Sequence, residues 1–245
     1  MDQRLTFESE GIELPAKTSS PKIKPTLVLC HGYPGTNFNE ETASALADLG
    51  FGIILFRYRG VLTNSGRHSL RGNERDIRSA VNAAESRGWQ RHGLGLLGYS
   101  FGGFHAIRVA ASDPKRVNFL VLMAPAANIG GLKAHLDSIT PNGFRDFIFS
   151  GSDMLVGNPR DWLMEAKGFT NDEQPTNLAK GLRIPLLILH GGRDEVVPLG
   201  LSKLLEGAWG GPRKLVVLDT DHDFKGMGTR VATEVSAFVR EQGIH

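Results

Sequence analysis

A serine enclosed by glycines is the residue of this sequence best suited to do chemistry. The pentapeptide GYSFG at residues 98–102 follows an apolar run at 94–97 and precedes a helix-compatible stretch at 103–111. When the pattern G-x-S-x-G joins a strand to a helix, the sharp turn lifts the serine hydroxyl above the sheet. The first N–H groups of that helix then favour negative charge beside the hydroxyl. Ser100 is therefore predicted to be a nucleophile.

A serine hydroxyl is a weak nucleophile at neutral pH and needs a base that a carboxylate orients. His222 lies directly after the last apolar run, at 214–218, and Asp194 lies in the turn after the run at 184–189. The sequence therefore predicts a catalytic triad of Ser100, His222 and Asp194. Three alternative acids flank the histidine, but residues adjacent in a loop rarely aim at each other's ring nitrogen: Asp219, Asp221 and Asp223.

The turn HGYPG at residues 31–35 ends the apolar run 26–30. Ligands of open α/β sheets bind at the carboxyl ends of the strands, so this turn can direct a backbone N–H into the site. We expect the N–H groups of Tyr33 and Phe101 to form an oxyanion hole. His31 is expected to be a buried turn histidine that bonds nearby backbone.

Composition limits the class of protein. The chain has 245 residues, 40% hydrophobic and 22% charged, with a formal net charge of +2. These values predict one globular domain over residues 1–245, with no nucleic-acid partner and no membrane partner. A polar N-terminus and the lack of an 18-residue apolar run favour a cytoplasmic location. Cys30 is the single cysteine and is expected to be a packing residue, and no motif indicates a metal site or a cofactor.

The order of apolar runs and turn signals predicts an α/β fold. A hairpin is expected over 4–8 and 11–14, before a Pro-rich link at 15–25. Continuous apolar runs, typical of strands buried on both faces, occupy 26–30, 51–56, 94–97, 117–123, 184–189 and 214–218. Amphipathic spacing predicts helices over 39–49, 73–87, 103–111, 199–208 and 229–242.

Residues 126–181 interrupt this alternation with short apolar and aromatic pieces. The segment is too long for a connection and too apolar for a linker, so we expect a helical cap over the site. Its bulky side chains are predicted to choose among substrates and to contribute little to the chemical step. The candidate substrate-binding residues are Phe144, Phe147 and Trp162.

Two further groups of polar residues have structural interpretations. His105, on the helix after Ser100, is expected in the core or a groove, and His190 is expected to support its own loop. The basic residues of 57–71 either meet an acidic substrate or bind nearby carbonyls and carboxylates such as Glu74 and Asp76: Arg57, Arg59, Arg67, His68 and Arg71.

Four motifs together resemble a known family: HGYPG at 31–35, GYSFGG at 98–103, HGGRDEVVP at 190–198 and DHDF at 221–224. They are similar to those of the α/β-hydrolase superfamily, in particular short cytoplasmic esterases of the serine-aminopeptidase-like and dienelactone-hydrolase-like branches. The resemblance implies the α/β-hydrolase fold, a mostly parallel central sheet flanked by helices with a short helical cap insertion. RG at 59–60 with NSG at 64–66 is similar to the R-G-x-G-x-S-x-G loop of those branches, but Leu62 and Thr63 stand where a glycine is usual.

The implied activity is that of a serine hydrolase of the carboxylesterase type, which cleaves a small ester through an acyl-enzyme. No cofactor is expected, and the chain is expected to be a monomer or a homodimer. A thioesterase or small-peptide hydrolase with the same triad remains an alternative. A non-catalytic ligand-binding protein on the same fold is another.

Overall fold

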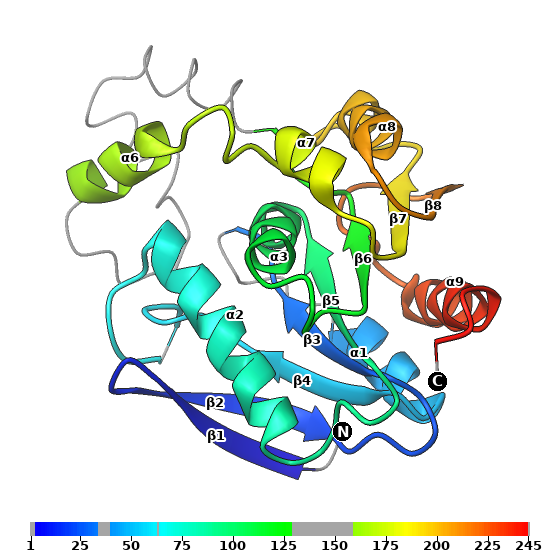
Figure 1. The fold of residues 1–245 in the computed structure, drawn as a ribbon, viewed down its shortest axis with the longest axis horizontal. Coiled ribbons are helices and arrows are strands. Elements are labelled where there is room, and N and C mark those ends of the chain that lie inside the picture. The colour runs from blue at the N-terminus through cyan, green and yellow to red at the C-terminus, as the bar shows by residue number, and fades with distance from the viewer. Residues whose placement is uncertain (1–2, 34–39, 63, 129–158, 245) are drawn as a thin grey trace.

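The centre of the structure is one sheet with helices on both faces (Figure 1). The computed structural model describes residues 3–33, 40–62, 64–128 and 159–244. The strands are β1 (Gln3–Ser9), β2 (Ile12–Ser19), β3 (Thr26–Cys30), β4 (Gly52–Phe56), β5 (Leu94–Tyr99), β6 (Phe119–Met123), β7 (Leu186–Gly191) and β8 (Arg213–Leu218).

Within the described residues the sheet has eight strands, in the order β1-β2-β4-β3-β5-β6-β7-β8. β2 is antiparallel to both of its neighbours, β1 and β4, and the remaining pairs are parallel. The carboxyl ends of β3 to β8 therefore lie along one edge of the sheet. The turns that carry the predicted site residues follow β3, β5, β7 and β8 at this edge.

The helices are α1 (Glu40–Asp48), α2 (Leu70–Glu85), α3 (Phe101–Ser112), α6 (Pro159–Gly168), α7 (Pro175–Leu178), α8 (Leu199–Ala208) and α9 (Gly228–Glu241), with a 3₁₀ turn at Ala179–Gly181. α1 and α9 pack together on one face of the sheet, and α2, α3 and α8 cover the other (Figure 1). α6 and α7 lie in the long connection between β6 and β7, within the predicted cap segment.

Two hydrophobic clusters, one on each face, explain why the central strands are continuously apolar. On β3, Val28 belongs to the cluster beneath α2 and α3, whereas Leu27 and Leu29 belong to the cluster beneath α1 and α9. Successive side chains of a strand point to opposite faces, so a strand covered on both sides needs apolar residues at every position. The predicted mostly parallel sheet with flanking helices is confirmed by this arrangement.

The N-terminal hairpin differs from its prediction. β2 does not end before Pro15 but continues to Ser19, and residues 16–19 pair with β4. Pro15 lies one position beyond the last β2–β4 pair, Ala16 with Phe56, so that side of the strand is unpaired at the proline. A proline is tolerated in a strand at such an edge because its missing N–H removes no ladder bond there. The predicted link therefore extends only from Ser20 to Pro25.

Candidate active site

The turn after β5 holds Ser100 in the conformation expected of a nucleophile elbow. Ser100 has φ 52° and ψ −120°, a left-handed backbone that a residue with a Cβ rarely adopts. Three backbone hydrogen bonds enforce it: Ser100 donates to the Met123 carbonyl at 2.8 Å, and its own carbonyl accepts from Gly103 and Ala126, each at 3.0 Å. The strain is therefore balanced by the sheet and by the first turn of α3.

Two glycines let the strand and the helix approach each other at this turn. A Cβ on Gly98 would lie 2.6 Å from the Cα of Gly103. A Cβ on Gly102 would overlap the backbone carbonyl oxygens of Cys30 and His31, at the end of β3. Backbone atoms cannot rotate away as a side chain can, so both positions require glycine.

Gly102→Ala is therefore expected to lower the free energy of unfolding by about 1–3 kcal/mol and kcat by at least about tenfold. The reason is that the added methyl group pushes α3, with the Phe101 N–H, away from β3. Urea unfolding and ester turnover measure the two effects. The matched control is Gly200→Ala in α8, where a Cβ meets nothing within 4 Å. Equal behaviour of the two variants would contradict the steric argument.

The structure brings Ser100, His222 and Asp194 together from three separate turns. His222 Nε2 lies 3.1 Å from Ser100 Oγ, and His222 Nδ1 lies 2.7 Å from Asp194 Oδ2. A carboxylate can only accept, so Nδ1 carries the proton and Nε2 is left to accept from the serine hydroxyl. This geometry equips Ser100 to lose its proton to His222.

Asp194 is the carboxylate that bonds the histidine ring, and the chain around it fixes its orientation. Its Oδ1 accepts from the backbone N–H groups of Val196 at 2.9 Å and Val197 at 2.8 Å. These bonds leave Oδ2 directed at His222, and the Asp194 side chain is fully buried. The turn from Asp194 to Val197 thus presets the acid before any substrate arrives.

The three alternative acids have other partners. Asp223 Oδ1 accepts from the Tyr99 hydroxyl at 3.3 Å, and Asp221 Oδ1 accepts from the Asp223 backbone N–H at 3.1 Å. The carboxylate of Asp219 is 88% exposed and lies 3.4 Å from Arg193. The carboxylate hydrogen-bonded to the His222 ring is that of Asp194.

His190 supports the Asp194 loop, as expected. It is fully buried, its Nε2–H donates to the Val197 carbonyl at 2.9 Å, and its Nδ1 accepts from the Ser202 hydroxyl at 2.7 Å. Burial lowers the pKa of His190, which keeps the ring neutral. A neutral imidazole can make one donated and one accepted bond, and both are used here.

The two candidate oxyanion donors belong to backbone next to Ser100: Tyr33 follows Gly32, and Phe101 begins α3. A Cβ on Gly32 would come within 3.0 Å of both Ser100 Cβ and the Tyr99 ring, so this backbone lies directly against the nucleophile. Tyr33 follows it. Phe101 is the first residue of α3, where a backbone N–H has no partner within the helix. Their positions are those expected of an oxyanion hole, which remains a prediction.

Tyr99 lies beside the triad and had no clear sequence signal. The Tyr99 ring lies 5.2 Å from the His222 ring, centroid to centroid, and its hydroxyl reaches Asp223 on the other side. Burial raises the pKa of Tyr99. Tyr99 is the first aromatic residue of the GYSFG motif, but its hydrogen-bond partner, Asp223, lies 124 residues away, so no local pattern indicates this contact.

The candidate substrate-binding residues have different outcomes. Phe144 and Phe147 lie outside the described residues. Trp162, on α6, is 3% exposed and packs against Tyr33, with a ring-centroid distance of 5.5 Å. Its Nε1–H donates to His68 Nδ1 at 3.3 Å. So little exposed surface favours a packing role over direct contact with substrate in this conformation.

Two of the basic residues of 57–71, Arg59 and Arg71, bind carboxylates of this chain, which is the second of the two interpretations above. The Arg59 side chain is 7% exposed, and its guanidinium donates to the carboxylates of Asp76 at 2.7 Å and Glu10 at 2.9 Å. Arg71 pairs with Glu173 at 3.0 Å, and its guanidinium lies over the Phe169 ring. Arg59 therefore ties α2 to the hairpin, and Arg71 ties it to the segment that follows α6.

Histidines beneath the site are buried and neutral. His31 donates from Nδ1 to the Gly32 carbonyl at 2.7 Å and accepts the Tyr58 backbone N–H at Nε2, at 3.2 Å. Burial lowers the pKa of His31 to about 3, and the same cause lowers the pKa of His68 to about 3. His105 is fully buried, and burial lowers its pKa as well. The predicted structural roles of His31 and His105 match these surroundings.

Acid is therefore expected to destabilise the fold through these rings. In an unfolded chain a histidine has a pKa of about 6.5. Below that pH the unfolded state binds protons at His31 and His68, whereas in the folded state both rings stay neutral. The contribution of these two rings to the free energy of unfolding is therefore complete above about pH 6.5 and declines as the pH falls toward about 3. Between pH 7 and pH 5 the loss is about 2 kcal/mol for each ring. Urea unfolding at both pH values, with His68→Asn beside the wild type, measures it. An unchanged pH dependence in the variant would contradict the assignment.

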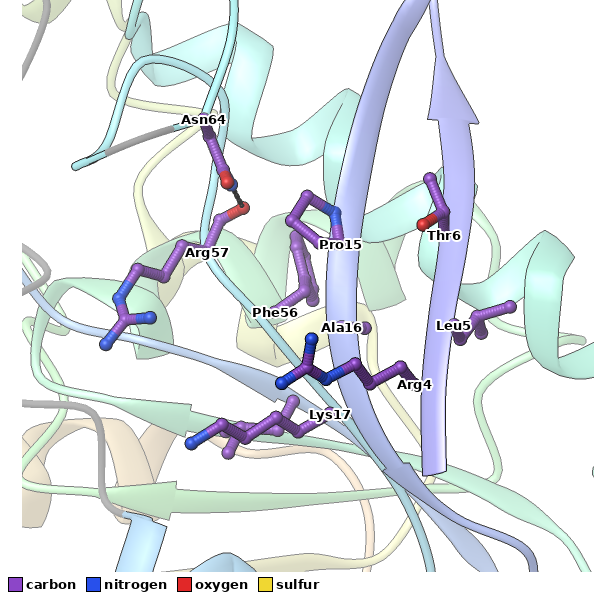
Figure 2. Close-up of a pocket in the computed structure, with 10 residues that line it drawn as sticks. Arg4, Leu5, Thr6, Pro15, Ala16, Lys17, Phe56, Arg57 and Asn64 are labelled. Carbon is purple, nitrogen blue, oxygen red and sulfur yellow. Dashed lines mark hydrogen bonds between the residues drawn. The ribbon is translucent and has the colours of Figure 1, made fainter. Parts of the chain in front are cut away.

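A cavity of about 520 Å³ lies beside the hairpin, on the face of β1, β2 and β4 opposite α2 (Figure 2). The figure shows the charged ends of Arg4, Lys17 and Arg57 on the same side of these strands. Lys17 also pairs with Glu40 of α1 at 2.9 Å. None of the triad residues lines this cavity.

The described residues contain neither a membrane-spanning helix nor a metal-binding cluster. In the ranges given above, no helix is long and apolar enough to cross a membrane. The same part of the chain holds no group of three or more histidine, cysteine, aspartate or glutamate residues able to bind a metal ion. Cys30 is buried with its thiol near the Val28 carbonyl, and burial raises its pKa.

Comparison with known proteins agrees with the fold. The alpha/beta hydrolase fold family matches residues 25–153, more than half of the chain. An uncharacterised protein of Mycobacterium tuberculosis is 26% identical over 196 residues, 79% of this chain and 61% of that protein. The acylamino-acid-releasing enzyme of Sus scrofa is 27% identical over 205 residues, 78% of this chain and 27% of the enzyme. This chain thus spans less than two thirds of the length of either relative.

Solved structures share the architecture over nearly the whole chain. Est1E from Butyrivibrio proteoclasticus, with ferulic acid bound, superposes with a TM-score of 0.81 at 22% identity, covering 98% of this chain and 100% of that one. The predicted fold class is confirmed by this likeness and by the family match. The order of strands, the elbow after β5 and the extent of the match together show that the chain belongs to the α/β-hydrolase fold family.

Proposed function

We propose that this protein is a serine hydrolase of the carboxylesterase type, which cleaves small esters through an acyl-enzyme. The observation that carries the proposal is the continuous line of hydrogen bonds from Ser100 Oγ through the His222 ring to Asp194, at 3.1 and 2.7 Å. Membership of the α/β-hydrolase fold family supports a hydrolase. Est1E, a structure of the same fold, binds ferulic acid, a carboxylic acid of the kind that ester hydrolysis releases, and this likeness supports an ester substrate.

The first half of the reaction forms the acyl-enzyme. Ser100 Oγ attacks the carbonyl carbon while His222 Nε2 takes the hydroxyl proton. The carbonyl oxygen becomes an oxyanion that the N–H groups of Tyr33 and Phe101 stabilise. When the C–O bond breaks, His222 returns the proton to the leaving alkoxide, and an alcohol departs.

The second half uses water in place of the serine. His222 takes a proton from the water, and the resulting hydroxide attacks the acyl carbon. The tetrahedral intermediate collapses, Ser100 regains its proton from His222, and the carboxylic acid leaves. Asp194 keeps the ring in the Nδ1–H tautomer throughout and stabilises the imidazolium, without itself taking a proton.

A fluorophosphonate probe, which reacts with an activated serine, tests the proposal directly. We expect it to label the wild type at Ser100 and to leave Ser100→Ala unlabelled. The same preparations are then assayed with p-nitrophenyl acetate, butyrate and octanoate. An unlabelled wild type that hydrolyses none of these esters would favour the alternative of a ligand-binding protein on this fold.

Hydrolysis of acylated peptides is the second candidate, supported by the likeness to the acylamino-acid-releasing enzyme. The same triad serves an amide if His222 protonates the departing amine. A matched pair of substrates with one acyl group, a p-nitrophenyl ester and a p-nitroanilide, separates the two. Turnover of the anilide at a rate comparable with the ester would assign the peptide activity. A thioester of that acyl group examines the remaining thioesterase alternative.

A further inference from the structure

The first turn of α2 obtains two of its hydrogen bonds from α6, a helix of the cap segment. The Glu165 carboxylate accepts from the backbone N–H groups of Leu70 at 2.7 Å and Arg71 at 2.9 Å. Ser69 caps the next N–H, that of Gly72, at 2.9 Å. A helix N-terminus leaves these N–H groups without partners in the helix and favours negative charge. Glu165 therefore fastens α6 to the body of the protein (Figure 1).

Trp162, almost one turn before Glu165 on α6, contacts the turn that follows β3. Its ring packs against Tyr33, and its Nε1–H bonds His68, which immediately precedes Ser69. A small hydrophobic cluster surrounds it and joins α6 to α3: Leu70, Phe104, Trp162, Ala166 and Phe169, with Tyr33, Phe101 and Leu163 packed against them. The docked position of α6 is thus held at both Glu165 and Trp162.

The Tyr33 side chain depends on this packing. Its ring lies between those of Trp162, His68 and Phe101, with centroid distances of 5.5, 5.8 and 6.2 Å. Its hydroxyl is buried and, within the described residues, has no hydrogen-bond partner. Aromatic packing therefore sets the position of the ring, and through it the position of the Tyr33 backbone beside Ser100.

We propose that α6 is a positioning element of the oxyanion hole, in which Trp162 and Glu165 hold the Tyr33 N–H at the distance from Ser100 that the transition state needs. The proposal rests on the proposed function and goes beyond it. It differs from the sequence prediction that the cap segment only selects substrates. A substrate-selecting wall changes the relative rates of different esters, whereas a positioning element changes kcat for all of them alike.

Four variants of the full chain test the proposal: Trp162→Ala, Trp162→Phe, Glu165→Ala and, as the matched control, Met164→Ala. Met164 lies on the same helix and is 60% exposed. For each we measure kcat and KM on the three p-nitrophenyl esters, affinity for a phenylboronic acid, and amide hydrogen exchange in residues 31–33. A boronic acid bound to Ser100 forms a tetrahedral adduct, so it reports the oxyanion hole itself.

Trp162→Ala and Glu165→Ala are expected to lower kcat about 10- to 100-fold on every ester, less than the 10²–10³ that loss of a whole donor costs. KM should change by less than about threefold, boronate affinity should fall in parallel with kcat, and exchange in residues 31–33 should rise. Trp162→Phe keeps an aromatic ring on Tyr33 and should retain most of the activity. Met164→Ala should match the wild type.

The proposal is overturned if the folded Trp162→Ala and Glu165→Ala proteins keep wild-type kcat, or if their losses depend on acyl-chain length. Glu165→Ala keeps the hydrophobic cluster intact, so it decides the question if Trp162→Ala does not fold. If the wild type hydrolyses no ester and reacts with no fluorophosphonate, the proposed function fails. Hydrogen exchange in residues 31–33 still shows whether Trp162 and Glu165 hold the Tyr33 backbone in place. Unchanged exchange in residues 31–33 in both variants would then overturn it.

Discussion

Replacing Ser100 with alanine is expected to lower kcat by about three to six orders of magnitude while the protein stays folded. In the proposed mechanism the hydroxyl oxygen forms the acyl-enzyme, and members of a triad act as a unit, so no neighbouring group replaces it. His222 and Asp194 retain their own hydrogen bond at 2.7 Å and need no serine to stay in place. Turnover of p-nitrophenyl butyrate by the purified variant measures the loss.

Two further measurements make this result decisive. Alanine keeps the Cβ of Ser100, so the strain at φ 52° is unchanged and the thermal stability should stay close to that of the wild type. The variant should still bind the carboxylic acid product, because the substitution removes only the serine hydroxyl. Near-normal turnover by a preparation free of wild-type protein would rule out Ser100 as the nucleophile.

Asp194→Asn is expected to cost about 10³ to 10⁴ in kcat. The asparagine oxygen can still accept the N–H groups of Val196 and Val197, so the amide NH₂ takes the place of Oδ2 and faces His222 Nδ1. A donor at this point forces the proton of the ring onto Nε2. Nε2, the nitrogen beside Ser100, then has no lone pair with which to receive the serine proton.

The control variants are Asp221→Asn and Asp223→Asn, which change the carboxylates on either side of His222 in the chain. These carboxylates accept from the Asp223 backbone N–H and from the Tyr99 hydroxyl. Each is expected to keep kcat within about tenfold of the wild type, with Asp223→Asn the lower because it supports Tyr99. A loss of 10³ in either control, with Asp194→Asn active, would transfer the role of the acid. Fluorophosphonate labelling rates provide a second measure of nucleophile activation.

Much of the site was predictable because its signals are local. The glycines on both sides of Ser100 are required by contacts within one strand-turn-helix unit, so the pentapeptide itself carries the information. Asp194 and His222 each follow an apolar run at its carboxyl end, and parallel strands bring those ends to one edge of the sheet. The topology could therefore be inferred without knowing any distance.

The fold was predictable to a similar extent, with one instructive exception at Pro15. Propensity identifies the strands because both faces of the sheet are covered, which demands unbroken apolar runs. It fails for β2, whose sequence after Leu14 is polar and begins with proline. Pairing with β4 extends this strand to Ser19, and that partner lies about 40 residues further along the chain, where no local pattern records it.

The sequence by itself determined the chemistry available to this protein: a serine in an elbow, a histidine and a carboxylate in the turns after two buried strands, and the α/β order that brings them to one edge. The tertiary structure decided which aspartate bonds His222, which carboxylates bind the basic residues, and how α6 meets Tyr33. These choices depend on contacts between residues 28 to 124 positions apart, such as His222 with Asp194, Leu70 with Glu165 and Tyr99 with Asp223. Hydrogen bonds and ring contacts of this kind depend on the directions of side chains in the packed structure, and a local sequence pattern does not specify those directions.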